Sequence, residues 1–218
     1  GRREIRLVTG NGLTNPLIFE VGTLPEAEEP ELVDPGKTVI TRVEIPVVIN
    51  GQILPGGVDR FRFAAKEGQR LVIEAQARKL IPYLGDAVPG WFQATLRLLD
   101  EKGREMAFAD DWRFDPDPVL YYEIPREGDY VLEVNGAIYR GREDFVYRVA
   151  ISQQPFITQV FPLGVKDGTS VTASIDGWNL SEREFKLDAK SPGGAIRRIF
   201  LEQDGKRSNS VIYAMDDL

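Results

Sequence analysis

A two-residue alternation of apolar and polar side chains runs through the middle of the chain. It occurs in four runs, at Arg60–Phe63, Leu71–Arg78, Tyr130–Asn135 and Phe145–Ile151. Successive side chains of a strand point to opposite faces of a sheet, so this alternation predicts strands with one buried face. Turn signals such as Asn50-Gly51 and Glu67-Gly68 separate the runs at the spacing of short antiparallel strands. Helical periodicity is nearly absent, and the chain is therefore predicted to be all-β, built from β-sandwiches.

A short segment occurs twice, at Thr14–Leu24 and at Ser208–Leu218. Both copies keep a small hydroxyl residue, an asparagine, and then branched and aromatic residues in one order. Such repetition predicts that both are the closing strand of the same kind of small β unit. The first copy lacks the residues that would precede it in such a unit. We therefore expect the chain to be a piece of an array, with a central module between the tail of one unit and a second unit.

An acidic stretch punctuated by prolines follows the first copy, at Leu24–Gly36, and is interpreted as a linker. This boundary divides the chain into three predicted parts. Residues 1–23 are the C-terminal hairpin of a truncated immunoglobulin-like unit. Residues 24–154 form a larger sandwich, and residues 155–218 form a small immunoglobulin-like sandwich.

Composition excludes several functional classes. The net charge of −7 argues against binding to nucleic acid or to an anionic membrane surface. No run approaches the roughly eighteen apolar residues of a spanning helix, so no membrane insertion is expected. The chain has neither cysteine nor histidine, which excludes disulfides, thiolate chemistry and Ser-His nucleophile pairs. Carboxylate, lysine and tyrosine chemistry remains.

An acidic cluster offers the main candidates for carboxylate chemistry. Asp110 and Asp111 are followed by Asp115 and Asp117, and such a group can hold a cation or provide an acid/base pair. The favoured interpretation is a turn in which carboxylates accept backbone N–H bonds. No nucleophile elbow or phosphate-binding glycine loop is present. The chain is accordingly predicted not to be an enzyme, with a carboxylate-dependent hydrolase or part of a secreted peptidase as the alternative.

Large aromatic residues supply the candidates for ligand binding. The loop Leu80–Phe92 carries Tyr83, Trp91 and Phe92, and Trp112 lies in the acidic cluster. Exposed aromatic side chains are common contacts to sugar rings and peptides. Alternatively, aromatic residues in a long loop fold back over the sheet edge and fill the core.

Several motifs of the central module resemble the bacterial pre-peptidase C-terminal domain. They are Gly57–Phe63, Gly68–Leu71, Asp110-Asp111 and Gly128–Val134. The resemblance implies a jelly-roll-type sandwich that accompanies catalytic domains in exported proteins, is similar to the collagen-binding domains of bacterial collagenases, and is not itself a peptidase. The segments Phe161–Gly164 and Asp176–Leu180, the latter interpreted as a turn, resemble the start of an IPT/TIG immunoglobulin-like domain.

The resemblance implies an extracellular, periplasmic or cell-surface location. The expected function is a non-catalytic accessory, binding or spacer module of a larger bacterial protein. Its expected partners are neighbouring domains of the parent chain, a polysaccharide or an extracellular protein.

The resemblance also implies a calcium site. Carried over by position, its ligands are Glu29, Glu31 and Asp59, with Asp34 as a fourth candidate. Two features depart from the related pattern, because Glu31-Leu32 replaces the usual Asn-Asp pair and Gly57 replaces an aspartate. Calcium takes six to eight oxygen ligands, so these losses reduce the set, and no cofactor is the primary expectation.

The N-terminal hairpin carries apolar faces without a sheet of its own. Residues 1–21 are therefore expected to pack on the second immunoglobulin-like unit or on a neighbouring molecule, which makes self-association a further expectation.

Overall fold

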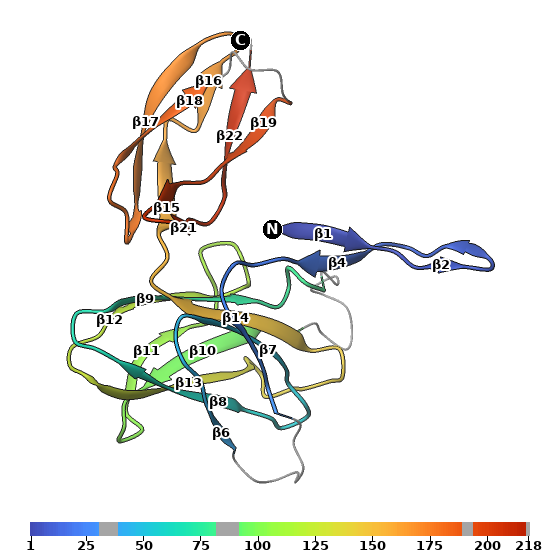
Figure 1. The fold of residues 1–218 in the computed structure, drawn as a ribbon, viewed down its shortest axis with the longest axis vertical. Helices are drawn as coiled ribbons and strands as arrows, with labels where there is room; N and C mark the ends of the chain where they lie inside the picture. Colours follow the sequence, from blue (N-terminus) through green and yellow to red (C-terminus); the bar gives the residue numbers. More distant parts are fainter. Residues whose placement is uncertain (31–38, 82–91, 189–193, 217–218) are drawn as a thin grey trace. The chain divides into compact units, whose positions relative to one another are not determined.

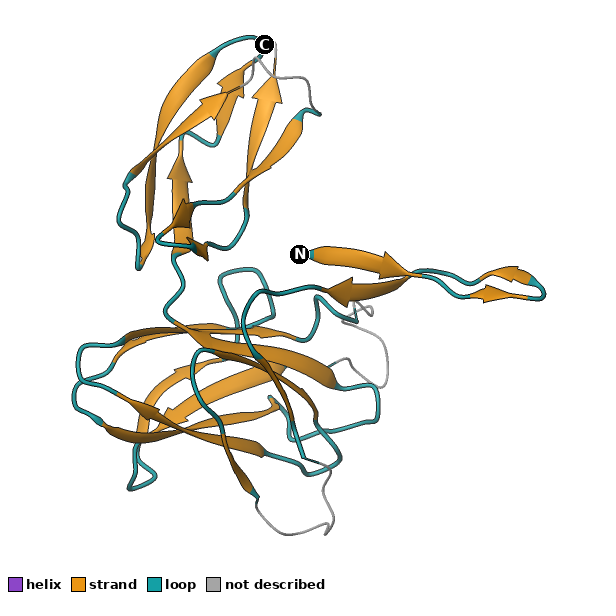
Figure 2. Ribbon diagram, in the orientation of Figure 1, coloured by secondary structure: helices purple, strands orange, loops and turns teal. Residues whose placement is uncertain are grey.

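The computed structural model describes residues 1–30, 39–81, 92–188 and 194–216. Within these ranges the regular structure consists of strands, and none of it is helical (Figure 2). Accordingly, the described residues include no helix with the length and apolar character needed to cross a membrane. The chain forms two compact units, Gly1–Ser152 and Gln153–Leu218. The prediction of an all-β chain built from sandwiches is confirmed.

Two five-stranded sheets form the large sandwich of the first unit (Figure 1). The first sheet has the order β11-β10-β13-β8-β6, with strands at Glu105–Ala109, Ala94–Leu99, Gly128–Gly136, Asp59–Ala65 and Ile40–Arg42. The second has the order β12-β9-β14-β7-β5, with strands at Val119–Glu123, Arg70–Gln76, Val146–Ser152, Val47–Gln52 and Glu26–Glu28. Neighbours are antiparallel except that β5 and β6 run parallel to β7 and β8.

The core of the large sandwich follows the alternation in the sequence. On β8, Phe61 and Phe63 are buried while the intervening Arg62 is exposed. Phe63 stacks on Tyr130 of β13 with ring centroids 6.3 Å apart. Burial of such side chains stabilises the fold by roughly 1.5–3 kcal/mol each, and the buried cluster includes residues from both sheets, which it holds together.

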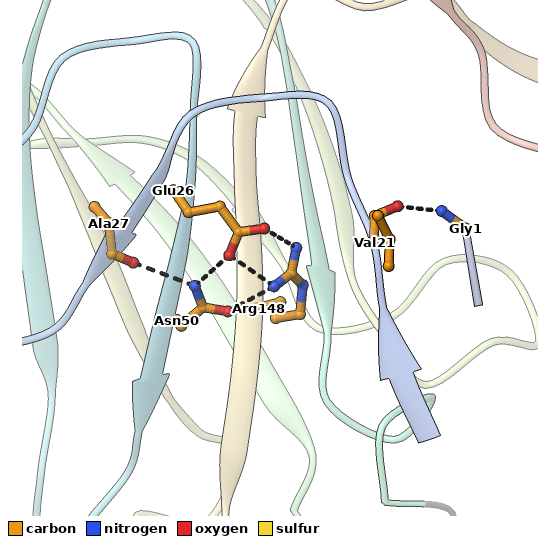
Figure 3. A network of polar contacts seen from close by, with 6 residues as sticks. All are labelled: Gly1, Val21, Glu26, Ala27, Asn50 and Arg148. Carbon is orange, nitrogen blue, oxygen red and sulfur yellow. Dashed lines mark hydrogen bonds and ion pairs between the residues drawn. The ribbon is translucent and has the colours of Figure 1, made fainter. Parts of the chain in front are cut away.

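Strand β5 is fixed to the sandwich by a polar clamp (Figure 3). Both guanidinium NH2 groups of Arg148 donate to the Glu26 carboxylate at 2.9 Å, and Arg148 also donates to Asn50 at 2.8 Å. Asn50 in turn donates to Glu26 at 2.8 Å. The Arg148 hydrogen bond lowers the pKa of Glu26. The stretch interpreted as a linker therefore begins within the sandwich rather than outside it.

The second unit consists of two three-stranded sheets. One has the order β15-β17-β18, at Phe156–Phe161, Ser170–Trp178 and Glu184–Asp188; the other has the order β16-β22-β19, at Gly164–Lys166, Val211–Asp216 and Ile196–Ile199. The turn expected at Asp176–Leu180 begins later, because β17 continues to Trp178, whose ring stacks on Phe156 at 5.3 Å. The chain then turns at Asn179, which has φ 55°.

Short hairpins extend two of the strand pairs. In the first unit β1 (Arg2–Ile5) pairs with β4 (Leu17–Glu20), and the connection contains β2 (Val8–Thr9) and β3 (Gly12–Leu13). In the second unit, β20 (Glu202–Gln203) and β21 (Lys206–Arg207) connect β19 to β22. The hairpin expected at the N-terminus is thus present.

Candidate functional site

Four residues between β11 and β12, Trp112–Asp115, form a tight turn that we call the aromatic tip. Trp112 and Asp115 exchange backbone hydrogen bonds of 2.8 and 3.0 Å, which leaves Arg113 and Phe114 at the end of the turn. Arg113 has φ 61°, an uncommon conformation for a residue with a side chain. Phe114 is fully exposed, at 105%. The backbone thus holds an aromatic ring in solvent.

Arg113 also covers its neighbour in the aromatic tip. Its guanidinium carbon lies 5.2 Å from the centre of the Trp112 ring, in a cation–π contact. One face of the indole is therefore occupied by a side chain of the same turn.

One buried and one half-buried acidic side chain connect the base of the aromatic tip to the segment that follows β9. Asp117 is almost completely buried and accepts the backbone N–H groups of Arg78 and Lys79 at 2.7 and 2.9 Å. Asp115 accepts the backbone N–H of Asp117 at 3.0 Å and lies 3.0 Å from the Lys79 ammonium. The turn interpretation of this acidic cluster is confirmed for Asp115 and Asp117.

Lys79 lies between two acidic groups, Asp115 and Glu74. Burial by itself would lower the pKa of Lys79, but the charge of Glu74 and the hydrogen bond of Asp115 raise it above the ordinary value. The ammonium therefore keeps its charge and binds Asp115 across the base of the aromatic tip.

Asp110 and Asp111, the candidate acid/base pair, are both exposed. The backbone carbonyl of Asp110 accepts the side-chain amide of Gln93 at 3.4 Å. Among the described residues, no group of three or more acidic side chains gathers as metal ligands, here or elsewhere.

The four aromatic residues predicted to contact a ligand lie in different parts of the chain and do not form one site in the described residues. The prediction that Phe92 contacts a ligand needs correction, because its ring is 6% exposed and stacks on Phe145 with centroids 5.1 Å apart. Phe92 thus fills the core, the alternative given for this loop. Tyr83 and Trp91 lie outside the described residues. Trp112 is half-buried within the aromatic tip, and Phe114, which the sequence analysis did not name as a candidate, is fully exposed.

A second gathering of polar groups lies between the two sheets, where Glu29 and Asp59 form what we call the carboxyl pair. Asp59 on β8 is 6% exposed and accepts the hydroxyl of Tyr147, from β14 of the opposite sheet, at 2.8 Å. Its carboxyl group is also hydrogen-bonded to that of Glu29, which follows β5. Glu29 accepts the backbone N–H of Gln52 at 3.0 Å. The sequence therefore brings together two of the four residues carried over as calcium ligands.

Gly51 makes room for the Tyr147–Asp59 contact. It lies directly opposite Tyr147 in the β7–β14 ladder, where side chains of paired residues share one face. A Cβ at Gly51 would overlap the Tyr147 phenol and lie 2.9 Å from a carboxylate oxygen of Glu29. Only glycine leaves this space.

The surroundings of the carboxyl pair favour one bound proton. Burial raises the pKa of Asp59 to about 8, and the hydrogen bond and charge of Glu29 act in the same direction, against the lowering effect of the Tyr147 hydroxyl. Burial also raises the pKa of Tyr147, so its hydroxyl stays a donor at neutral pH.

The described residues supply two of the oxygen ligands that a calcium ion would need. Calcium takes six to eight oxygen ligands, usually carboxylates, carbonyls and water. Glu29 and Asp59 supply two carboxylates whose mutual repulsion a cation would relieve. Glu31 and Asp34, the other two residues carried over, lie outside the described residues.

Comparison with known proteins gives low similarities. The chain matches no protein-family model and no curated protein. A pre-peptidase C-terminal domain of collagenase from Bacillus anthracis aligns with 55% of this chain and 100% of its own, at 13% identity and a TM-score of 0.40. The periplasmic g-type lysozyme inhibitor PliG of Aeromonas hydrophila aligns with 52% of this chain and 96% of its own, at 15% identity and a TM-score of 0.35. PliG of Salmonella Typhimurium aligns with 60% of this chain and 98% of its own, at 18% identity and a TM-score of 0.34. Similarity at this level assigns no function to this chain.

Proposed function

We propose that the chain is a non-catalytic accessory module of a larger exported bacterial protein, and that its large sandwich docks a protein through the aromatic tip. The observation that carries the proposal is the full exposure of Phe114 in a turn whose backbone and base are fixed. A large aromatic side chain held in water costs free energy that contact with a partner would recover. The exported location follows the resemblance of the sequence motifs.

The chemistry of the aromatic tip favours a protein partner over a polysaccharide. Sugar rings stack on flat aromatic faces, and Arg113 covers one face of Trp112. Phe114 beside an arginine instead matches protein interfaces, whose buried centres are enriched in aromatic residues and arginine.

The carboxylates near the aromatic tip support a structural role over a catalytic one. Asp117 accepts two backbone N–H groups, and Asp115 bridges the turn and Lys79. A general acid or base must instead reach the substrate with a hydrogen-bonding atom free to exchange its proton. These two groups are engaged in holding the turn.

The docking proposal predicts a strong effect of Phe114→Ala. Binding would be measured against immobilised collagen and fibronectin and against chitin, cellulose and peptidoglycan. We expect a protein of this panel to bind, and the variant to bind about thirtyfold more weakly, the loss typical of a central interface residue at about 2 kcal/mol.

Phe108→Ala provides the matched control for this test. Phe108 is a half-exposed aromatic residue on β11, away from the turn, and its removal should leave binding unchanged. The proposal would be contradicted if both variants lost binding equally. It would also be contradicted if the chain bound only polysaccharides of the panel, or nothing in it.

We also propose that the carboxyl pair binds calcium, supported by the contact between Glu29 and Asp59. A cation must displace the proton of Asp59, whose pKa lies at about 8, so calcium should bind better at pH 9 than at pH 6. At roughly ten times its dissociation constant, calcium should raise the melting temperature of the large sandwich by roughly 4 °C at pH 9. The rise should be smaller at pH 6.

Magnesium chloride and the Asp59→Asn variant serve as controls for the calcium experiment. Neither should show the calcium-dependent rise, because magnesium demands a tighter octahedral set of ligands and the variant lacks a carboxylate. An unchanged melting temperature of the natural chain at pH 9 would leave the pair as a proton-sharing contact between the sheets.

A further inference from the structure

The hairpins β1–β4 and β19–β22 are built on one plan. In the first, Arg2 pairs with Glu20 and Ile5 with Leu17; in the second, Ile196 pairs with Ala214 and Ile199 with Val211. Each residue of the first hairpin therefore corresponds to the residue 194 positions later, as Ile5 does to Ile199. The match covers the whole ladder, whereas the repeat visible in the sequence covers only the second strand.

The connections of the two hairpins match as well. Thr14 Oγ1 accepts the backbone N–H of Leu7 at 3.0 Å, and Ser208 Oγ accepts that of Leu201 at 2.8 Å. The reciprocal backbone bonds, Thr14 to Leu7 and Ser208 to Leu201, are 3.0 and 2.9 Å long. The small hydroxyl residue of each copy thus fixes the same turn of the chain.

The largest difference between their apolar faces is exposure. In the second unit Leu201 and Tyr213 are each 6% exposed, and Ile199 and Met215 are also buried. Their counterparts at the N-terminus are 65% exposed at Leu7 and 49% at Phe19, and Ile5 and Val21 are exposed too. Residues 1–21 therefore present, uncovered, the face that the second unit buries.

The second unit displays what covers this face. Its apolar side chains pack against Ile157 and Val160 of β15, Val165 of β16, Ile175 of β17 and Leu187 of β18. The side chain of Asn209 also holds β15, because its oxygen accepts the backbone N–H of Ile157 at 2.6 Å and its nitrogen donates to the carbonyl at 2.9 Å. The counterpart of Asn209 is Asn15, which is exposed.

We propose that residues 1–21 are completed by a segment equivalent to β15–β18, carried in the parent protein ahead of Gly1. This segment would bury Ile5, Leu7, Phe19 and Val21, and the amide of Asn15 would bind the backbone of its first strand. The second unit of another copy does not fit as the occupant, because its own hairpin already fills that place. The parent protein then alternates large and small sandwiches with a period of 194 residues, and this proposal does not depend on the docking role of the aromatic tip.

The first experiment transplants the hairpin. Ala195–Met215 of the full chain are replaced by a second copy of Gly1–Val21, which has the same length. We expect the second unit to keep a cooperative unfolding transition, with a melting temperature within about 10 °C of the natural one, since volume-conserving apolar changes are tolerated in cores. A matched chimera with Phe19→Asp in the transplanted copy should lose that transition.

The second experiment supplies the missing half. A copy of Gln153–Gly194 is fused ahead of Gly1 of the full chain, and amide hydrogen exchange is measured at Thr14 and Val21, whose N–H groups bond within the hairpin. Exchange should slow by about 100-fold or more compared with the natural chain, because a packed hairpin opens only with its unit. The same fusion with Ile175→Asp in the added copy should give no protection.

Three outcomes would overturn the proposal. In the first, the Thr14 and Val21 amides of the monomeric natural chain are already as protected as those of the fusion, which would mean that the chain covers its own hairpin. Another is protection that appears only in a dimer and disappears on dilution or with Phe19→Asp, which makes a second copy the occupant. The third is a chimera that loses its transition together with a fusion that gains no protection.

Discussion

Replacing Asp59 by asparagine is expected to remove most of the dependence of the large sandwich's stability on pH between about 5 and 8. Asp59 is buried between the sheets, where burial and Glu29 raise its pKa to about 8. In the unfolded chain its pKa returns to about 3.9. Between these values the folded state holds a proton that the unfolded state has released.

The sign of the effect follows from this difference in bound protons. Stability contributed by the protonated group is fully present below pH 4 and is lost as the pH rises through the folded pKa of about 8. A four-unit difference corresponds to at most roughly 5 kcal/mol. Because the hydroxyl of Tyr147 and the positive charge of Arg60 favour the ionised group, we expect a loss on the order of 2–3 kcal/mol.

Urea unfolding of both proteins at pH 5 to 9, followed for the large sandwich, measures this loss. The Asp59→Asn curve should be nearly flat, because an amide occupies the same space and has no proton to release in this range. Asp111→Asn, at an exposed aspartate, is the control and should retain the slope of the natural chain. A slope in Asp59→Asn equal to that of the control would rule out the carboxyl pair as its source.

Gly177→Ala is expected to unfold the second unit, or nearly so, while the large sandwich remains folded. Gly177 lies opposite Ile157 next to an irregularity in the β15–β17 ladder. A Cβ there would overlap the carbonyl oxygen of Phe156 and lie 3.0 Å from the Cα of Ile157. Because these are backbone atoms of the paired strand β15, no side-chain rotation relieves the overlap.

The expected loss is about 3 kcal/mol or more, at the upper end of overpacking in cores. A unit of this size has a total stability of only roughly 3–10 kcal/mol, so most of it would be removed. Calorimetry should show the transition of the second unit shifted strongly downward or absent, with that of the large sandwich unchanged. Gly194→Ala is the control, since a Cβ there has its nearest neighbour 4.0 Å away; a similar loss in both variants would contradict the steric explanation.

The strands were predictable because the information that specifies them is local. The alternation around Phe61 and Phe63 predicts a strand with one buried face, and β8 has this pattern. The repeated segment likewise predicts a shared closing strand. The acidic stretch after Leu24 was less predictable, because β5 forms through pairing with β7 and through the distant Arg148, against a local composition typical of linkers.

The two candidate sites were predictable to different degrees. Glu29 and Asp59 were named from a family resemblance, but the hydrogen bond between Asp59 and Tyr147 joins residues 88 positions apart, which no local pattern encodes. Phe114 carried one usable signal, an aromatic residue amid the acidic residues of a turn. Its exposure, however, depends on the positive φ of Arg113, a conformation that the residue type does not favour.

The places where the chain enters and leaves the large sandwich have a mechanical consequence. Glu26 at the start of β5 pairs with Val48, and Ile151 near the end of β14 pairs with Val47, so the chain enters and leaves at the same end of the strands of one sheet. Tension applied through the two ends would load the backbone hydrogen bonds between β5 and β7 one after another rather than together. The clamp of Glu26, Asn50 and Arg148 lies at the first of these strand pairs to be loaded, where it resists separation of β5 from β7.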